Sequence, residues 1–321
     1  MIEYILFAIL SFGVTFIFTK LLIPRLKRVG MTGQDENKID HPEIPEMGGI
    51  AIVAGFTAGT LIAIFADSFF GLNVNMIYLL ASILTIHSIA FIGLVDDLID
   101  IPQRVKAFLP LFAAIPLVAV KAAASTVITI PLLGMFDFGV LYILVLIPIA
   151  IAVCSNLTNM LAGYNGLETG VGAIAFLALS LIAISRGSTE MGILSVSMLG
   201  ALLAFLAFNF YPAKIFPGDV GALTIGVVIA SAVIIGNIES AGVILVIPYV
   251  IDFFIKAVNG FPRTHQEIRN GKLYPKDGKV KGFSHLVMKL SGGITEKGLV
   301  LFFMGLESIF AIVVLILYLK V

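Results

Sequence analysis

Two adjacent carboxylates interrupt an otherwise apolar region of the chain. Asp96 and Asp97 close the apolar run 76–95, and Lys106 stands just before the next one. A charged side chain close to hydrocarbon is costly, so an ionisable cluster at the mouth of a membrane helix is a functional-site hypothesis. We therefore expect Asp96, Asp97 and Lys106 to carry the chemistry of this protein.

Other polar residues share this position at one end of an apolar run. They are Asn156, Asn159, Asn165 and Glu168 between or at the edges of the runs 139–155 and 167–185, Asp219 at the start of 218–236, and Arg263 and His265 after 241–258. Separate loops thus bring carboxylates, amides and cations to one face, which predicts a single pocket.

The residue types in this pocket indicate a reaction class. Carboxylate and amide oxygens without cysteine are hard ligands that suit Mg²⁺. Lys106, Arg263 and His265 suit phosphate or pyrophosphate. Glycines at positions 48, 49, 163, 166, 218 and 221 let backbone amides approach a ligand closely. Together they predict phosphoryl transfer onto a lipid, which needs alignment and charge neutralisation more than a strong base.

The composition excludes a soluble globular domain. Hydrophobic residues make up 59% of the 321 residues and charged residues only 12%, against roughly 25% charged in soluble domains. The net charge is zero, so no binding to nucleic acid is expected. The single cysteine, Cys154, rules out an internal disulfide and a cysteine metal cluster.

The elements that position these residues are membrane spans, each of about 20 apolar residues. Ten segments qualify, at 2–22, 48–66, 76–95, 107–123, 139–155, 167–185, 191–210, 218–236, 241–258 and 299–319. No internal repeat and no appended soluble domain is visible. We expect an all-α integral membrane protein that forms a single domain over 1–321.

The distribution of cations predicts the orientation of the spans. With ten spans both termini lie on one face, and all but three of the 20 Lys and Arg residues fall on the other. The termini are therefore expected outside and the loops with Asp96 and Asp219 in the cytoplasm. The loop 259–298 contains apolar residues from Phe283 to Leu290 at helical spacing, which predicts a short interfacial helix. The outer segment 124–138 is expected to form a small hairpin.

Simpler interpretations stay open for several of these residues. The Asp96–Asp97 pair is also compatible with solvated charge, the amides at 156 and 159 with a bond to a neighbouring helix, and Lys106 and Arg263 with topology anchors. Glu168 fits either a loop-orienting or a ligand-binding role. Asp219 fits an ordinary helix start, Asp252 and Lys256 most simply form an ion pair, and His87 fits a satisfied buried histidine.

Five separated motifs together resemble one enzyme family, over nearly the whole chain. They are Ile44-Pro-Glu-Met-Gly-Gly49, Asp96-Asp97 with Lys106, the run Asn156–Glu168, Phe216-Pro-Gly-Asp219, and Arg263 with His265. The chain is similar to the polyprenyl-phosphate N-acetylhexosamine-1-phosphate transferases. This resemblance implies a membrane enzyme that moves GlcNAc-1-phosphate from UDP-GlcNAc to dolichyl or another polyprenyl phosphate and releases UMP.

The resemblance also implies residue roles. Asp219 and Asn159 would hold Mg²⁺, or Mn²⁺ in its place, on the UDP pyrophosphate. Asp96 and Asp97 would lie at the reaction centre, with Asp96 accepting the acceptor's proton and Lys106 neutralising the phosphates. The implied substrate-binding residues are Glu46, Asn156, Gly163, Asn165, Glu168, Phe216, Arg263 and His265. Phe216 would stack on uracil while Asn165 bonds its edge.

The details of the motifs favour the eukaryotic and archaeal dolichyl-phosphate branch. The chain lacks the triple histidine of the peptidoglycan translocase, and Arg263-Thr-His265 stands where the eukaryotic branch has Arg-His-Arg. An archaeal enzyme in the plasma membrane fits this mixture. Transfer of another UDP-N-acetylhexosamine phosphate stays open as an alternative, as does assembly into a homodimer.

Three other classes of membrane protein share part of this pattern. Asp96-Asp-Leu-Ile-Asp100 spells the DDxxD pattern of membrane prenyltransferases, but no second aspartate-rich cluster exists. An intramembrane Gly-x-Gly-Asp protease would need a glycine where Phe216 stands, and a partner aspartate in mid-membrane. A nucleotide-sugar transporter usually shows internal repeats with a midplane site. The pattern of this chain favours the transferase over all three.

Overall fold

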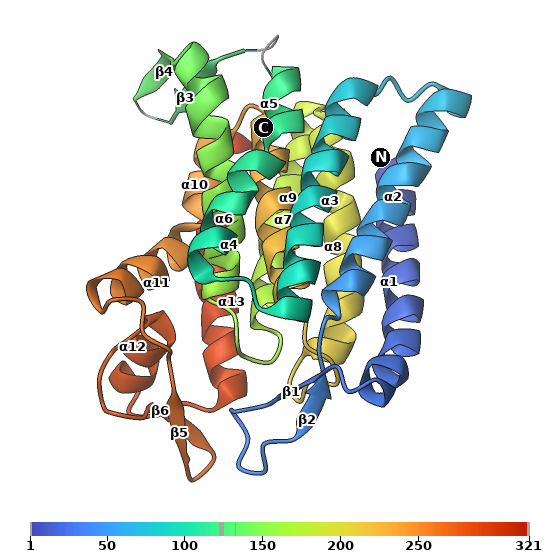
Figure 1. Ribbon diagram of the computed structural model, residues 1–321. Helices are drawn as coiled ribbons and strands as arrows, with labels where there is room; N and C mark the ends of the chain where they lie inside the picture. The colour runs from blue at the N-terminus through green and yellow to red at the C-terminus, as the bar shows by residue number, and fades with distance from the viewer. Residues whose placement is uncertain (1, 122–124, 132, 320–321) are drawn as a thin grey trace.

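The protein is a bundle of membrane-length helices. The computed structural model describes residues 2–121, 125–131 and 133–319. Within that part of the chain, nine helical segments are long and apolar enough to cross a membrane, and a bent helix pair makes a tenth. This confirms the prediction of an all-α membrane fold with about ten spans. The start of the first helix, α1, and the end of the last helix, α13, lie at the same end of the bundle (Figure 1).

Most spans are close to their predicted bounds. They are α1 (Ile2–Arg28), α2 (Gly49–Phe70), α3 (Met76–Ile99), α4 with α5 (Gln103–Ala113 and Ile115–Lys121), the π-helix η1 with α6 (Tyr142–Leu146 and Ile147–Met160), α7 (Leu167–Arg186), α8 (Thr189–Asn209), α9 (Gly218–Ile235) and α13 (Glu296–Tyr318). The predicted fourth span extends to residue 123, beyond the described residues.

Helix α9 is the centre of the bundle. Every residue from Val220 to Ile235 is buried, and α2, α3, α6, α7 and α8 all pack against it. A helix that is apolar all round fits either lipid or the interior of a bundle, and here other helices surround it. The functional residue at the start of α9 is therefore held by the best-packed element of the molecule.

The predicted ninth span, 241–258, is wrong as a continuous helix. It consists of α10 (Glu239–Leu245) and α11 (Ile247–Val258), which are bent by 59° at Val246. Pro248 lies in the first turn of α11, where its missing N–H costs nothing. A single helix through this position would instead lose a backbone hydrogen bond and clash with the preceding turn. In Figure 1, α11 leaves the bundle sideways.

Small elements surround the two ends of the bundle. Strands β1 (Thr32–Gln34) and β2 (Glu43–Pro45) pair antiparallel, as do β5 (Gln266–Arg269) and β6 (Lys272–Pro275). Both hairpins lie at the end opposite the start of α1 (Figure 1). The predicted helix in the loop 259–298 is present as α12 (Phe283–Leu290). The predicted outer hairpin is present as β3 (Val127–Ile130) with β4 (Gly134–Asp137).

Candidate active site

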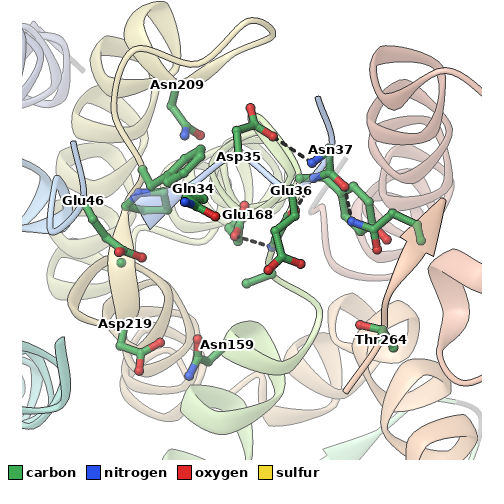
Figure 2. A pocket seen from close by; sticks show the side chains of 17 residues that line it. Gln34, Asp35, Glu36, Asn37, Glu46, Asn159, Glu168, Asn209, Asp219 and Thr264 are labelled. Atoms are coloured by element: carbon green, nitrogen blue, oxygen red, sulfur yellow. Dashed lines mark hydrogen bonds between the residues drawn. The ribbon is translucent and has the colours of Figure 1, made fainter. Parts of the chain in front are cut away.

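A polar cavity of about 350 Å³ opens between the ends of α6 and α9 and the two hairpins β1–β2 and β5–β6. Its lining comes from separate segments of the chain, as Figure 2 shows. The side chains and backbone that line it belong to Gln34, Asp35, Glu36, Asn37, Glu46, Asn159, Ala162, Gly163, Tyr164, Glu168, Asn209, Phe216, Pro217, Gly218, Asp219, Thr264 and Gln266. Of the predicted site residues, the cavity brings together Glu46, Asn159, Gly163, Glu168, Phe216 and Asp219 from distant loops, and the others do not line it.

Lys106 joins two of the predicted catalytic carboxylates. Its ammonium group, which is almost fully buried, forms ion pairs with both Asp96 and Asp219. The second oxygen of Asp96 accepts a hydrogen bond from the backbone N–H of Ile101 at 2.7 Å. A buried charge requires such partners. Lys106 is therefore a paired cation and not a solvated topology anchor. Asp96, Asp97 and Lys106 are not part of the cavity lining, but all three are held close to Asp219, which is.

Asp97 holds the start of α9. Its two carboxylate oxygens accept hydrogen bonds from the backbone N–H groups of Asp219, at 2.7 Å, and Val220, at 3.1 Å. A carboxylate at this place satisfies amides that have no partner within the helix and faces the positive end of its dipole. Asp97 thus fixes the position of Asp219 from the neighbouring helix.

Glycines make this contact between α3 and α9 possible. A β-carbon on Gly93, one turn before Asp97, would lie 2.6 Å from the Cα atom of Val220. A β-carbon on Gly218 would lie 2.6 Å from a carboxylate oxygen of Asp97, and the backbone there has φ of +66°. Only glycine combines this conformation with so close an approach.

The oxygen donors on one side of the cavity fit a hard cation. Figure 2 shows Asp219, Asn159 and Glu46 on the same side. Burial, and then the charge of Asp219, raise the pKa of Glu46, so extra positive charge at this place would be favourable. Among the described residues no group of three His, Cys, Asp or Glu side chains is arranged to hold a metal ion alone. Mg²⁺ is typically held by one or two carboxylates and completed by substrate phosphates, which this donor set fits.

Glu168 orients the loop 161–166 between α6 and α7, here called the glycine loop, which lines part of the cavity. One of its oxygens accepts a hydrogen bond from the backbone N–H of Gly163 at 3.0 Å. The other oxygen is buried and has no hydrogen-bond partner among the described residues. The contact with Gly163 supports the loop-orienting role of Glu168, and ligand binding by this residue of the cavity lining stays a prediction.

Four of the predicted substrate contacts lie outside the cavity lining. The amide of Asn156 donates to the carbonyl of Ala152 at 2.8 Å and faces α4. The amide of Asn165 donates to Asp35 at 3.1 Å and accepts from the N–H of Ala213 at 2.7 Å. Both side chains are therefore engaged within the protein.

Arg263 and His265 are exposed, and neither side chain lines the cavity. The lining residues of this segment are instead Thr264 and Gln266. Alternate side chains of an extended segment point in opposite directions. Residues next to the predicted ones thus face the cavity, and single-sequence reasoning had no signal to choose between the two sets.

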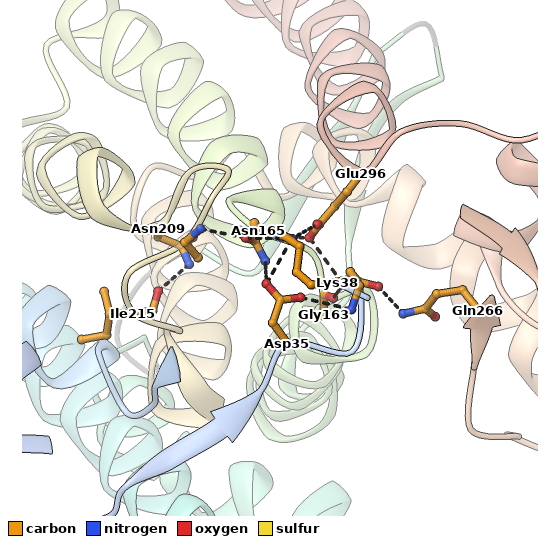
Figure 3. Close-up of polar contacts among 10 residues, drawn as sticks. Asp35, Lys38, Gly163, Asn165, Asn209, Ile215, Gln266 and Glu296 are labelled. Atoms are coloured by element: carbon orange, nitrogen blue, oxygen red, sulfur yellow. Dashed lines mark hydrogen bonds and ion pairs between the residues drawn. The ribbon is translucent and has the colours of Figure 1, made fainter. Parts of the chain in front are cut away.

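A buried polar network behind the cavity was missed by the sequence analysis (Figure 3). Lys38 forms ion pairs with Asp35, at 3.1 Å, and Glu296. Burial lowers the pKa of Lys38, but the hydrogen bonds and charges of Glu296 and Asp35 outweigh that effect and raise it. Glu296 also accepts from the N–H of Asn165 at 2.8 Å. The only available signal was the dense polar run 34–38 in the first inner loop.

Asn37 connects this network to the cavity. Its amide donates to the carbonyl of Gly163 at 2.8 Å, and its oxygen accepts from Gln266. The first inner loop, the glycine loop and strand β5 are therefore joined through one side chain. Two simpler expectations also agree with the structure: Asp252 and Lys256 form an ion pair at 2.8 Å, and His87, which is half-buried, is hydrogen-bonded to Thr57 and Ile83.

A comparison with protein families identifies the class to which this fold and site belong. The family described as glycosyl transferase family 4 matches residues 76–237, which include α3, α6 and α9 with all their cavity residues. The chain therefore belongs to glycosyl transferase family 4.

Individual relatives cover nearly the whole chain. A protein of Saccharolobus solfataricus with the provisional name UDP-N-acetylglucosamine–dolichyl-phosphate N-acetylglucosaminephosphotransferase is 41% identical over 96% of this chain and 95% of its own length. A protein of Sulfolobus acidocaldarius with the same provisional name is 39% identical over 97% and 95%. The phospho-N-acetylmuramoyl-pentapeptide-transferase of Halalkalibacterium halodurans is 34% identical over 72% and 74%. The resemblance to an archaeal branch of the family is thereby confirmed.

Proposed function

We propose that this protein transfers GlcNAc-1-phosphate from UDP-GlcNAc to dolichyl or another polyprenyl phosphate and releases UMP. The observation that carries the proposal is the pair of archaeal relatives, which are 39% and 41% identical over almost the entire chain and bear that activity in their names. The cavity supports it independently, because it combines acids and amides at one end of a membrane bundle, and a buried lysine, Lys106, is paired with its lining residue Asp219.

In this reaction an oxygen of the lipid phosphate attacks the sugar-bearing phosphorus of the donor. A new P–O bond forms there, the bond to the phosphate of UMP breaks, and UMP leaves with that electron pair. A phosphate monoester has its second pKa near 6 and is mostly ionised at pH 7. The attacking oxygen therefore needs no strong base, and the protein's task is to align two phosphates and offset their charge.

The residues of the cavity fit this task. Asp219 and Asn159 would hold Mg²⁺, which neutralises the donor pyrophosphate when bound. Lys106 adds a second positive charge beside Asp219. Asp97 keeps Asp219 in place through two backbone hydrogen bonds. The oxygens of Asp96 and Asp97 are engaged by protein donors, which supports direct attack by the lipid phosphate over a covalent aspartyl-phosphate.

The donor's uridine and sugar extend along the remaining lining. Phe216 supplies an aromatic face for uracil on the side of Asp219, and the glycine loop at Gly163 supplies close backbone groups. Thr264 and Gln266 offer neutral hydrogen-bonding groups, which suit an uncharged N-acetylhexosamine. The cavity end of the bundle carries most of the Lys and Arg residues, so we place it in the cytoplasm and the protein in the plasma membrane.

The test is an assay of purified protein with UDP-GlcNAc, polyprenyl phosphate and Mg²⁺, in which UMP and the lipid product are both measured. Equal amounts of the two products are expected, with none after chelation of the metal. UDP-N-acetylmuramoyl-pentapeptide is the matched alternative donor, because one group of relatives uses that name. Turnover of that donor alone, or UMP release without lipid product, would contradict the proposal.

A further inference from the structure

Helix α11 stands apart from the well-packed core of the bundle. Of its 12 residues only Pro248, Tyr249 and Asp252 are buried. Phe254 and Val258 are 61% and 83% exposed and face outwards. The 59° bend after α10 carries this helix away from the bundle axis. Val250, Ile251, Phe253 and Ile255 are half-buried against the bundle, and polar contacts on the inner face of α11 add to this packing.

Those polar contacts come from an ion pair on the inner face of α11. Lys256 lies 2.8 Å from a carboxylate oxygen of Asp252, and both side chains are largely buried. The same ammonium group donates to the backbone carbonyl of Met160 at the end of α6. The other oxygen of Asp252 accepts from the backbone N–H of Phe283, the first residue of α12, at 2.7 Å. We call Asp252, Lys256 and these two backbone partners the α11 clasp.

The α11 clasp reaches both walls of the cavity. Met160 directly follows Asn159, which lines the side of the cavity next to Asp219. On the other side, a β-carbon on Gly282 would touch Asp252, Lys256 and Thr264 alike, at 3.0 to 3.3 Å. Thr264 lines the opposite part of the cavity. The buried ion pair Asp252–Lys256 thus lies between Asn159, which is expected to hold the metal, and Thr264, which is expected to face the sugar.

An ion pair four residues apart on a helix needs no function of its own, and a solvated pair would contribute little. This pair differs because its lysine turns inward to a carbonyl that terminates another helix. A plain topology anchor would instead extend toward water. Loss of either partner would leave a buried charge without compensation and free the end of α6 from α11.

We propose that the α11 clasp is a positioning device that couples the outward-facing helix α11 to the two walls of the donor site. This inference rests on the proposed function. Lys256 holds the end of α6, and therefore Asn159, in register with Asp219. Asp252 holds the start of α12, and therefore the Thr264 segment. Displacement of α11 by a lipid at its exposed face would then change the affinity of the cavity for the metal-bound donor.

The test compares Lys256→Met with Lys281→Met in the full-length protein. Lys281 is a matched control, because it also forms an ion pair four residues along, with Asp277 at 2.6 Å, but outside the cavity. Hydrogen exchange of the unliganded protein is the first readout. In Lys256→Met we expect residues 157–166 and 262–267 to exchange about tenfold faster. Lys281→Met should match the wild type, and Lys256→Arg should restore most of the protection.

The second readout is turnover against Mg²⁺ concentration. A displaced Asn159 should raise the Mg²⁺ concentration required by Lys256→Met about tenfold, an effect that loss of stability alone does not produce. Unchanged exchange in both segments, or equal effects of Lys281→Met, would overturn the inference. If Lys256→Met does not fold, Asp252→Asn provides the same comparison. Absence of turnover in the wild type would refute the proposed function. The hydrogen-exchange data would still show whether the α11 clasp positions the two segments of the cavity.

Discussion

Asp96 and Asp97 are neighbours in the chain, but their carboxylates have different partners. Asp96 pairs with Lys106, while Asp97 accepts two backbone hydrogen bonds from the start of α9. The two residues therefore divide the work of holding the site: one fixes the cation and the other fixes Asp219. An adjacent pair of acids in a sequence signals a site, but it does not show which acid meets the substrate.

The role of Asp97 leads to a test by a nearly isosteric change. Asp97→Asn keeps one acceptor oxygen and places an amide donor against an N–H group, so Asp219 should shift. A small displacement of an aligned group costs about 100-fold in kcat, and we expect a loss of that size in the UMP-release assay. Asp100→Asn is the control, since Asp100 is exposed and ends α3 at φ of 52°, a conformation that asparagine tolerates. Wild-type kcat in Asp97→Asn would contradict this role.

Glu46 predicts a dependence of stability on pH. Because burial and the charge of Asp219 raise its pKa, the folded protein binds this proton more tightly than the unfolded chain does. Ionisation of Glu46 as the pH rises therefore destabilises the fold. Glu46→Gln cannot ionise, so without metal or donor it should melt at a higher temperature than the wild type at about pH 8, with a smaller difference at about pH 5. An equal difference at both pH values would count against this assignment.

Sequence reasoning at the residue scale found the segments that form the site, but it did not show which of their side chains face the cavity. Asp219, Asn159, Glu46 and Glu168 line the cavity as expected. Asn165 does not, because its amide is used by Asp35 and Ala213. Which polar side chain is already satisfied by the protein depends on contacts between loops far apart in the chain. A single sequence carries no record of those contacts.

At the scale of elements, small residues decide how close the helices of the site come. Gly93 on α3 and Gly221 on α9 sit where the backbones of α2, α3 and α9 converge. This close packing allows a short aspartate side chain on one helix to reach the backbone of another. Whether the Asp97 side chain contacts the backbone of α9 therefore depends on the small residues of both helices.

Substitution of these glycines tests that point. Gly93→Ala places a methyl group 2.6 Å from the Cα atom of Val220, and overpacking of this kind costs about 1–3 kcal/mol. We expect a lower melting temperature together with a loss of kcat, since α9 moves away from Asp97. Gly305→Ala in α13 meets no atom within 4 Å and should be neutral or slightly stabilising. If both variants behaved alike in melting and turnover, close helix packing would not be what holds Asp219.

The helices themselves could be predicted almost completely, because long apolar runs admit few structures in a membrane. The exception was the division of the ninth span at Val246. Hydropathy alone does not register such a break, since α10 and α11 are both apolar. Pro248 was the available signal in the sequence. A proline alone, however, does not show that the helix before it points in a different direction from the helix after it.

At the scale of the whole molecule, the orientation in the membrane can be measured directly. The native cysteine, Cys154, is buried, so an added cysteine reports its own side. Ser125→Cys lies before the β3–β4 hairpin and Lys279→Cys lies in the loop that carries β5 and β6; both positions are exposed. We expect an impermeant maleimide to label the first in intact cells and the second only after lysis. The reverse pattern would place the cavity outside the cell.

The order of the helices in the chain has a consequence for biosynthesis. Most of the helices that pack against α9, namely α2, α3, α6, α7 and α8, are made before it, and α10 follows it. Until α9 is synthesised, Asp97 on α3 has no α9 backbone to bind, and the glycine-containing surfaces of the neighbouring helices contact lipid instead. Asp219 and the backbone amides that Asp97 binds are thus added only after these helices. A nascent chain cut short before α9 would therefore have most of its membrane helices and no activity.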